Sequence, residues 1–399
     1  MVEKARHAGP ARPPDVVAVV EELLGRALEA QASDVHFEPT PSGLVVKYRL
    51  DGALQTVQTL PAALAENVIS RLKVLGGLLT YRTDIPQEGR IDRPGGPGGA
   101  VFQQRLAVFP TVHGQRAVVR LFYQDSGLDE LDELGLPESI CADLKRMVAA
   151  NRGVLLLTGP AGSGKSTTLA AIMRYILARY PGKSIVALED PVERHVAGVT
   201  QVEIPAHGAM TFPVALRSLL RQDPEVLMVG EVRDAETARI VVEAGLTGHL
   251  LLTTMHSGTP AGALIRLLEM GVEPYQVTSA VAAVLNQRLV RRLCERCKRP
   301  DEQGGFAPGG CQSCHRTGYR GRVLIAELVR MDPAIRAAVG AKADQQQIEG
   351  ILLERAHQGI LDSGMALIAA GVTTRRELNR VCGYADDEET PCRSSNTKR

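Results

Sequence analysis

The hydrophobic pattern in the first third of the chain predicts a small mixed domain. Apolar residues recur with a helical period over 15–31 and again over 62–75. Alternating apolar and polar residues predict strands over 33–39, 43–50, 101–109 and 115–122. Together these segments form an α+β domain over 15–123. A polar, proline-rich arm (1–14) is expected to be disordered, and an acidic stretch (124–136) is typical of an interdomain linker.

From about residue 137 the pattern changes to short apolar runs that alternate with amphipathic helices. The runs predict strands over 154–157, 184–188, 226–229 and 250–254, and the helices are expected over 166–180, 214–221 and 234–246. This alternation predicts a mostly parallel sheet with helices on both faces, in a core domain over 137–292. Ligands of such sheets bind at the carboxyl ends of the strands, so chemistry should follow each strand.

The C-terminal part of the chain divides by composition. A cysteine-containing element spans 293–322, and one more strand (323–329) opens a largely helical region over 323–382. The last residues, 383–399, are polar and are expected to be disordered.

Composition narrows the class of protein. With 399 residues, 44% hydrophobic and 23% charged, the chain can form two or three globular domains. Its net charge of +1 gives no general attraction to nucleic acid, so we expect no direct nucleic-acid binding. No apolar run approaches the roughly 18 residues that span a bilayer, and no secretory signal is visible. We therefore expect a cytoplasmic protein, in which seven cysteines indicate metal ligands or unpaired thiols.

A phosphate-binding motif directly follows the strand expected over 154–157. It reads Gly159, Pro160, Ala161, Gly162, Ser163, Gly164, Lys165, Ser166 and Thr167, which matches the P-loop pattern. The glycines let backbone N–H groups turn toward an anion, and the following helix adds its dipole. Lys165 is placed to reach the β- and γ-phosphates, and Ser166 to ligate Mg2+. A chance match is the alternative, but the flanking strand and helix favour a nucleoside triphosphate site.

Carboxylates follow the next two strands. Glu189, Asp190 and Glu193 come after the strand over 184–188, where a solvated turn is the alternative interpretation. Glu231 comes after the strand over 226–229, which is the Walker B arrangement and makes it the candidate general base. Gly230 stands where an aspartate usually precedes that glutamate. Magnesium would therefore depend on Ser166, on water and on Glu189 or Asp190.

A histidine follows the strand over 250–254. His256 is placed where a side chain can sense the γ-phosphate, although a lone histidine is more often structural.

Two cysteine pairs lie further along the chain, with 13 residues between them. Their members are Cys294, Cys297, Cys311 and Cys314. Four thiolates on two tight turns favour a tetrahedral structural Zn2+ site, and four unpaired thiols are the alternative. The span between the pairs lacks hydrophobic periodicity, so a metal would hold it folded. Cys141, Cys382 and Cys392 have no such partners and are expected to be bystanders.

Together these motifs resemble those of the secretion and pilus-assembly ATPases of the type II secretion/type IV pilus family. Besides the P-loop, the matching stretches are 32–39, 189–193, 216–224, 230–234, 247–256 and 287–294, and the similarity covers roughly 15–382. The resemblance implies an α/β fold. A RecA-like P-loop NTPase domain would be preceded by the small α+β domain and followed by a zinc-binding and helical C-terminal region.

The resemblance also implies an activity and partners. Family members are ATPases that use ATP and Mg2+, form homohexamers and bind nucleotide between the small domain and the RecA-like domain. Closure of the small domain drives an inner-membrane platform protein, which assembles a pilus or pseudopilus. We therefore expect recruitment to the cytoplasmic face of the inner membrane through partners. The chain begins directly at the small domain, so recruitment should differ from that of members with an additional N-terminal domain.

Individual site residues follow from the motif match. Glu231 matches the catalytic glutamate, Glu189, Asp190 and Glu193 match the Asp box, and His249 and His256 match the His box. Candidates for phosphate-contacting arginines are Arg105, Arg116 and Arg120 in the small domain and Arg217 and Arg221 in the RecA-like domain. The alternative for each arginine is a solvated or carboxylate-paired surface residue.

The four cysteines bear on whether the protein would drive pilus extension or secretion, or instead pilus retraction. In the family, this element belongs to extension or secretion ATPases and is absent from pilus retraction ATPases. Arg291 and Arg292, just before it, are interpreted as surface charge.

Two other classes of protein stay open: a DNA-uptake or conjugation-type transport ATPase, and a nucleotide-responsive scaffold that does not hydrolyse ATP.

Overall fold

The computed structural model describes two compact units of the chain, with the boundary between residues 125 and 126. The described residues are 15–93, 102–123, 130–205, 208–301 and 304–383. The expected arm (1–14), part of the expected linker (124–129) and nearly all of the expected tail (384–399) lie outside them.

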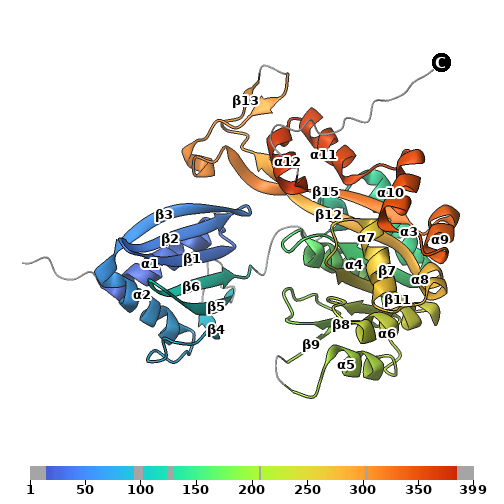
Figure 1. Cartoon of the computed structure of the whole chain (residues 1–399), viewed down its shortest axis with the longest axis horizontal. Coiled ribbons are helices and arrows are strands. Elements are labelled where there is room, and N and C mark those ends of the chain that lie inside the picture. Colours follow the sequence, from blue (N-terminus) through green and yellow to red (C-terminus); the bar gives the residue numbers. More distant parts are fainter. Residues whose placement is uncertain (1–14, 94–101, 124–129, 206–207, 302–303, 384–399) are drawn as a thin grey trace, which may run out of the picture. The chain divides into compact units, whose positions relative to one another are not determined.

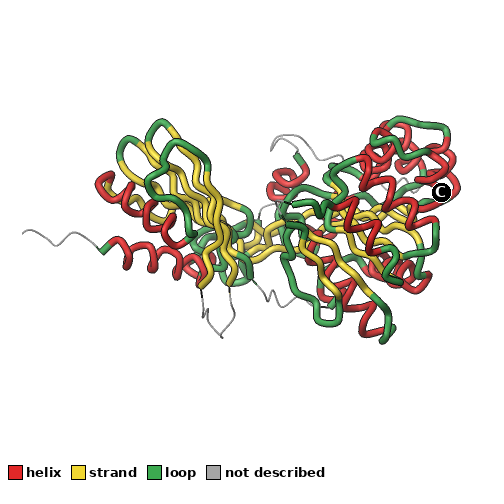
Figure 2. Tube along the Cα trace, turned by 90° about the horizontal axis from the view of Figure 1, so that it is seen from below, coloured by secondary structure: helices red, strands yellow, loops and turns green. Residues whose placement is uncertain are grey.

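The described residues of the N-terminal unit form a six-stranded antiparallel sheet with two helices. The strand order is β3-β2-β1-β6-β5-β4. Its elements are α1 (Val16–Glu29), β1 (Asp34–Thr40), β2 (Gly43–Leu50), β3 (Ala53–Pro61), α2 (Ala62–Leu75), β4 (Gln87–Arg93), β5 (Phe102–Thr111) and β6 (Gly114–Leu121). Both helices lie on one side of the sheet (Figure 2), where Val35 and Phe37 of β1 pack in the core. Because side chains alternate along a strand, Asp34, His36 and Glu38 lie on the opposite face.

The C-terminal unit contains a seven-stranded sheet with helices on both faces (Figures 1 and 2). The strand order is β15-β12-β7-β11-β10-β8-β9, and the pairing is parallel except for β15, which is antiparallel to β12. The strands are β7 (Gly153–Thr158), β8 (Ile185–Glu189), β9 (Thr200–Glu203), β10 (Val226–Val229), β11 (Leu250–Met255), β12 (Val281–Leu293) and β15 (Tyr319–Arg330). The central strands are buried along their whole length, as continuous apolar runs in parallel sheets are. The predicted mostly parallel sheet is confirmed.

Helices cover this sheet and extend beyond it. They are α3 (Glu138–Ala150), α4 (Lys165–Arg179), α5 (Phe212–Leu219), α6 (Ala235–Leu246), α7 (Pro260–Glu269), α8 (Pro274–Ala280), α9 (Pro333–Gly340), α10 (Gln345–Glu354), α11 (Ile360–Ala369) and α12 (Arg375–Cys382). Short 3-10 turns occur at Leu131–Glu133 and Gln312–Cys314. No helix in the described ranges is long and apolar enough to cross a bilayer.

β12 is a central strand that the sequence analysis did not predict. Its polar residues Asn286, Gln287 and Arg288 interrupt the apolar run, so the sequence pattern did not indicate a strand there. Asn286 and Gln287 are nevertheless fully buried. β12 pairs with both β7 and β15, so the cysteine-containing element is an insertion between two strands of one sheet. The element carries a short hairpin of its own, β13 (Arg299–Pro300) and β14 (Phe306–Ala307).

Candidate nucleotide site and metal centre

The P-loop lies between the carboxyl end of β7 and the first turn of α4. Gly159, Gly162 and Gly164 have φ angles of +139°, +74° and +91°, which favour glycine. A Cβ on Gly159 would lie 2.3 Å from the carbonyl oxygen of Gln287, so β12 leaves no room for another side chain there. The loop is therefore built from glycines both for its turns and for its contact with β12.

Lys165 folds back onto its own loop. Its Nζ donates hydrogen bonds to Gly159 O at 2.9 Å and to Pro160 O at 3.0 Å. Burial lowers the pKa of Lys165, and the charges of Glu231 and Glu193 oppose that shift. Ser166 is exposed in the first turn of α4, where the helix dipole favours an anion.

Glu231 is held from two sides at the end of β10. Its Oε1 lies 3.0 Å from His256 Nε2, just past β11, and its Oε2 accepts a 2.7 Å hydrogen bond from Arg233 Nε. Arg233 Nη1 also donates to Asp190 Oδ2, just past β8, at 3.3 Å. The ends of three neighbouring strands thus bring Asp190, Glu231 and His256 together, with Arg233 bridging Asp190 and Glu231.

Glu189 is the last residue of β8 and is buried. Burial raises its pKa to about 7, the charge of Glu193 adds to the effect, and a 2.9 Å hydrogen bond from Gln201 Nε2 opposes it. Of the expected Asp-box residues, Glu193 is the one whose charge also acts to raise the pKa of Lys165.

Two residues of this region had no role in the sequence analysis. Arg233 bridges the two carboxylates, and its spacing of two residues from Glu231 is the signal that could have indicated it. Gln287 is buried on β12 and donates to Ser163 O of the P-loop at 2.9 Å. A polar side chain within an apolar run was the available signal for this contact.

His249 is not part of the cluster around Glu231. It directly precedes β11, and its backbone oxygen accepts from Gly153 N, at the amino end of β7. Its Nδ1 lies 3.1 Å from Thr247 Oγ1 and 3.2 Å from Ala244 O. Since β7 and β11 are parallel, His249 lies at the amino ends of the strands, whereas the P-loop lies at their carboxyl ends.

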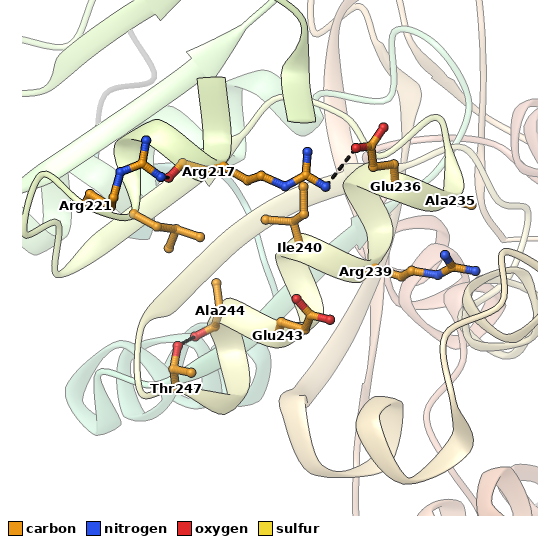
Figure 3. A pocket seen from close by; sticks show the side chains of 10 residues that line it. Arg217, Arg221, Ala235, Glu236, Arg239, Ile240, Glu243, Ala244 and Thr247 are labelled. Atoms are coloured by element: carbon orange, nitrogen blue, oxygen red, sulfur yellow. Dashed lines mark hydrogen bonds and ion pairs between the residues drawn. The ribbon is translucent and has the colours of Figure 1, made fainter. Parts of the chain in front are cut away.

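Arg217 and Arg221 line an open pocket of about 740 Å³ between α5 and α6 (Figure 3). Arg217 Nη2 forms a 2.8 Å ion pair with Glu236 Oε1, and Arg221 Nη1 donates to Arg217 O at 2.8 Å. The pocket is lined by residues between 217 and 247 and by none of the P-loop. Within one chain, these two arginines therefore have local partners.

The three candidate arginines of the N-terminal unit share the sheet face opposite α1 and α2. Arg116 Nη2 lies 3.2 Å from Glu38 Oε1, and Arg120 Nε lies 3.1 Å from Asp34 Oδ1. Arg105 lies over the ring of Phe122, 5.9 Å from its centroid. Arg120 is still 65% exposed, so its ion pair leaves much of the guanidinium accessible.

The four paired cysteines form a cluster with the geometry of a metal site. Their sulfur atoms all lie within 4.8 Å of one another, with Cys294–Cys311, Cys297–Cys314 and Cys311–Cys314 distances of 3.9, 3.7 and 3.8 Å. Four thiolates around Zn2+ at about 2.3 Å would lie about 3.8 Å apart, so the donor set fits tetrahedral zinc.

Backbone groups prepare this cluster for a cation. Gly310 N donates to Cys297 Sγ, and both Cys311 N and Gly318 N donate to Cys314 Sγ, at 3.2 to 3.3 Å. Burial would raise the pKa of Cys314, but the N–H groups of Cys311 and Gly318 and the neighbouring thiols lower it to about 6. Burial and the other three thiols raise the pKa of Cys297 to about 11, against the effect of Gly310 N. Cys141 lies elsewhere, donating to Asp132 Oδ1, and Cys392 lies outside the described residues.

Arg291 corrects the expectation of a surface charge. It is only 18% exposed, and its Nη2 lies 2.6 Å from Glu377 Oε2 on α12. Its guanidinium also lies over the Tyr319 ring, 4.2 Å from the centroid. Arg292 remains on the surface with a 3.8 Å pair to Glu295. Arg291 thus ties the start of the cysteine-containing element to α12.

A family model described as "Type II/IV secretion system protein" matches residues 13–380. The chain belongs to this family. The type II secretion system protein HxcR of Pseudomonas aeruginosa is 41% identical over 366 residues, which are 92% of this chain and 77% of that protein. The type IV pilus assembly ATPase PilB of Thermus thermophilus is 38% identical over 377 residues, 90% of this chain and 42% of that protein.

The fold is also found among solved structures. The Legionella pneumophila ATPase DotB matches with a TM-score of 0.69 at 22% identity, covering 94% of this chain and 98% of that chain. The family and this likeness confirm the predicted fold class, an α/β RecA-like core with a small N-terminal α+β unit and a C-terminal cysteine cluster suited to zinc.

Proposed function

We propose that this protein is a Mg2+-dependent ATPase whose hydrolysis of ATP powers the assembly of a type IV pilus or a type II secretion pseudopilus. The observation that carries the proposal is the 3.0 Å contact between Glu231 and His256 beside the P-loop strand. The family supports the setting, because HxcR is named a type II secretion system protein and PilB a type IV pilus assembly ATPase.

In the proposed reaction Glu231 orients the attacking water and accepts its proton. Arg233 and His256 fix the two carboxylate oxygens, so the base needs little reorganisation when substrate arrives. His256 is 49% exposed, which leaves part of its ring accessible to the γ-phosphate.

Lys165 would exchange its two carbonyl acceptors for phosphate oxygens. The exchange is favourable because phosphate oxygens carry negative charge, so the lysine gains an ion pair that the neutral carbonyls do not supply. Ser166 would hold Mg2+, supported by the carboxylates of Glu189, Asp190 and Glu193. Held there, Mg2+ would supply positive charge that offsets the negative charge developing on the phosphates.

We also propose that the protein works as a homohexamer at the cytoplasmic face of the inner membrane, where a platform protein receives the work. Arg105, Arg116 and Arg120 are the proposed source of positive charge for the phosphates, which their shared open sheet face supports. Arg217 and Arg221 have local partners and His249 lies at the amino end of β11, so we propose that any role for them at the phosphates involves a neighbouring subunit. Zn2+ on the four cysteines would be structural.

Phosphate release by the purified full chain tests this proposal, with Lys165→Ala as the variant and Lys183→Ala as the control. Lys183 pairs with Glu225 at the amino ends of β8 and β10, the ends of the strands opposite the P-loop. We expect Mg2+-dependent release that Lys165→Ala abolishes and Lys183→Ala leaves unchanged. Release that survives Lys165→Ala would contradict the site. Release that requires DNA would favour a DNA-transport ATPase, and binding without turnover, even with the platform's cytoplasmic domain, would favour a scaffold.

A further inference from the structure

Three consecutive side chains of β12 donate hydrogen bonds to three different segments. Gln287 Nε2 donates to Ser163 O in the P-loop at 2.9 Å. Asn286 Nδ2 donates to Gly258 O, two residues after His256, at 3.1 Å. Arg288 Nη2 donates to the same Gly258 oxygen at 3.0 Å, and its Nη1 donates to Val381 O at the end of α12. β12 therefore contacts the P-loop, the turn that follows β11 and contains His256 and Gly258 (the His256 turn), and the last helix, α12.

Gln287 lies close to the P-loop at Gly159 and at Gly164. Besides the Gln287 carbonyl 2.3 Å from a Cβ on Gly159, its Nε2 would lie 3.3 Å from a Cβ on Gly164. Gln287 is fully buried, and among the described residues its Oε1 and Ser163 Oγ are buried without hydrogen-bond partners. A buried amide whose donor is aimed at a loop carbonyl fixes where that loop lies.

Asn286 belongs to a polar row that crosses the sheet. In register it faces Thr158 of β7 on one side and Glu327 of β15 on the other. Thr158 Oγ1 lies 3.4 Å from Asn286 Oδ1, and Asn286 Nδ2 donates to Glu327 Oε1 at 2.7 Å. Glu327 in turn accepts from the backbone N–H of Ile360, at the start of α11. These hydrogen bonds fix the Asn286 side chain, which in turn positions the His256 turn through Gly258 O.

We propose that Gln287 is a positioning residue for the phosphate-binding loop, and that Asn286 and Arg288 position the His256 turn, so that β12 sets the distance between the triphosphate and the Glu231–His256 pair. This inference rests on the proposed ATPase function. Neither Gln287 nor Arg288 touches the reacting atoms, and each acts through the backbone carbonyl that it holds.

The two contacts predict different kinetic effects. The P-loop binds the phosphates both in the ground state and in the transition state, so displacing it raises KM with a smaller effect on kcat. The His256 turn reaches the nucleotide through Glu231, which acts in the transition state. Displacing the turn therefore lowers kcat with a smaller effect on KM. General loss of stability predicts neither pattern.

The experiment measures kcat, KM and the affinity for a fluorescent ADP in the full chain, for Gln287→Met and Arg288→Met. We expect Gln287→Met to raise both KM and the ADP dissociation constant by about tenfold. We expect Arg288→Met to lower kcat by about tenfold and to leave the ADP affinity near that of the wild type. Gln287→Glu keeps the shape of the side chain and is measured in the same way if the methionine variant does not fold.

Val290→Ala is the matched control. Val290 is fully buried on the same strand and packs with Ile325 and Leu378 rather than with the P-loop. It should lower the melting temperature, because truncating a buried side chain leaves a cavity, while KM, kcat and ADP affinity stay unchanged.

Two results would overturn the inference. One is unchanged KM and ADP affinity in a folded Gln287 variant. The other is a Val290→Ala profile that shows the KM change of Gln287→Met or the kcat change of Arg288→Met, which would make the β12 contacts merely structural. If the wild-type protein itself does not hydrolyse ATP, the proposed function fails. The ADP affinity of the Gln287 variants then still decides the part of the inference that concerns the P-loop.

Discussion

Glu231 illustrates what single residues could reveal before the fold was known. Its place after an apolar strand predicted a base, and the structure adds Arg233 and His256 as the groups that contact it. The sequence could not indicate Gln287 in the same way, because its contact with Ser163 joins positions 124 residues apart. Short-range motifs are visible in sequence, whereas partners supplied by another strand depend on the pairing of the sheet.

Gly230 stands where an aspartate usually precedes the Walker B glutamate, and the structure explains why a glycine lies there. A Cβ at this position would lie 3.3 Å from Leu188 O and 3.4 Å from Glu189 Cα, because β8 and β10 are neighbours. An aspartate would also bring a second carboxylate toward buried Glu189. We expect Gly230→Asp to destabilise the C-terminal unit by about 1–3 kcal/mol and to lower ATP turnover.

Gly230→Ala separates the effect of space from that of charge, since it adds the Cβ alone. Thermal unfolding and phosphate release of both variants check the prediction. An aspartate variant that is as stable as the alanine variant and turns over ATP faster than the wild type would show that this site accepts the usual Walker B acid.

At the scale of elements, continuous apolar runs were predicted well and mixed runs were not. The strands β7, β8, β10 and β11 lie where the sequence placed them, because each is buried along its whole length. The polar middle of β12 concealed a central strand of the same sheet. The alternating polar residues of β3, such as Gln55 and Gln58, concealed an edge strand.

The cysteine-containing element should depend on its metal. We expect about one zinc ion per purified chain, because the four sulfurs already have tetrahedral spacing. Cys311→Ser should lose the metal, whereas Cys141→Ser, which alters a buried thiol outside the cluster, should retain it. Metal analysis of the three proteins checks this. Zinc absent from folded wild-type protein, or retained in Cys311→Ser, would contradict a four-cysteine site.

The anchor of this element to α12 predicts a pH dependence. Burial would raise the pKa of Glu377, but hydrogen bonds from Arg380 and Arg291 lower it below the ordinary value. A lowered carboxyl pKa stabilises the folded state above the ordinary pKa, and this stabilisation is lost as the pH falls through the lowered value. Glu377→Gln should therefore cost about 3–5 kcal/mol at pH 7 and progressively less in acid.

Urea unfolding of the wild type and of Glu377→Gln at several pH values measures this difference. Glu236→Gln is the control, since the Arg217–Glu236 pair is about half exposed on both sides and should contribute little. A difference that does not shrink as the pH falls would mean that the Glu377 charge is not what holds the element.

For the whole molecule, the sequence indicated the family and the order of its parts, because its motifs are short and occur in a fixed succession. It did not show that the cysteine-containing element interrupts the ATPase sheet, since that depends on β12 pairing with β15. This topology joins the metal centre, α12 and the P-loop through a single strand. We expect events at the nucleotide to be transmitted along β12.

The most direct test of the account is ATP hydrolysis across a series of protein concentrations, with Glu231→Gln measured beside the wild type. We predict that turnover per chain rises as the protein self-associates. Glu231→Gln should bind ATP but hydrolyse it about 10²–10⁴-fold more slowly, because the general base is lost. Equal turnover in the variant, or no turnover at any concentration with ATP bound and the platform's cytoplasmic domain added, would contradict an ATPase built around Glu231.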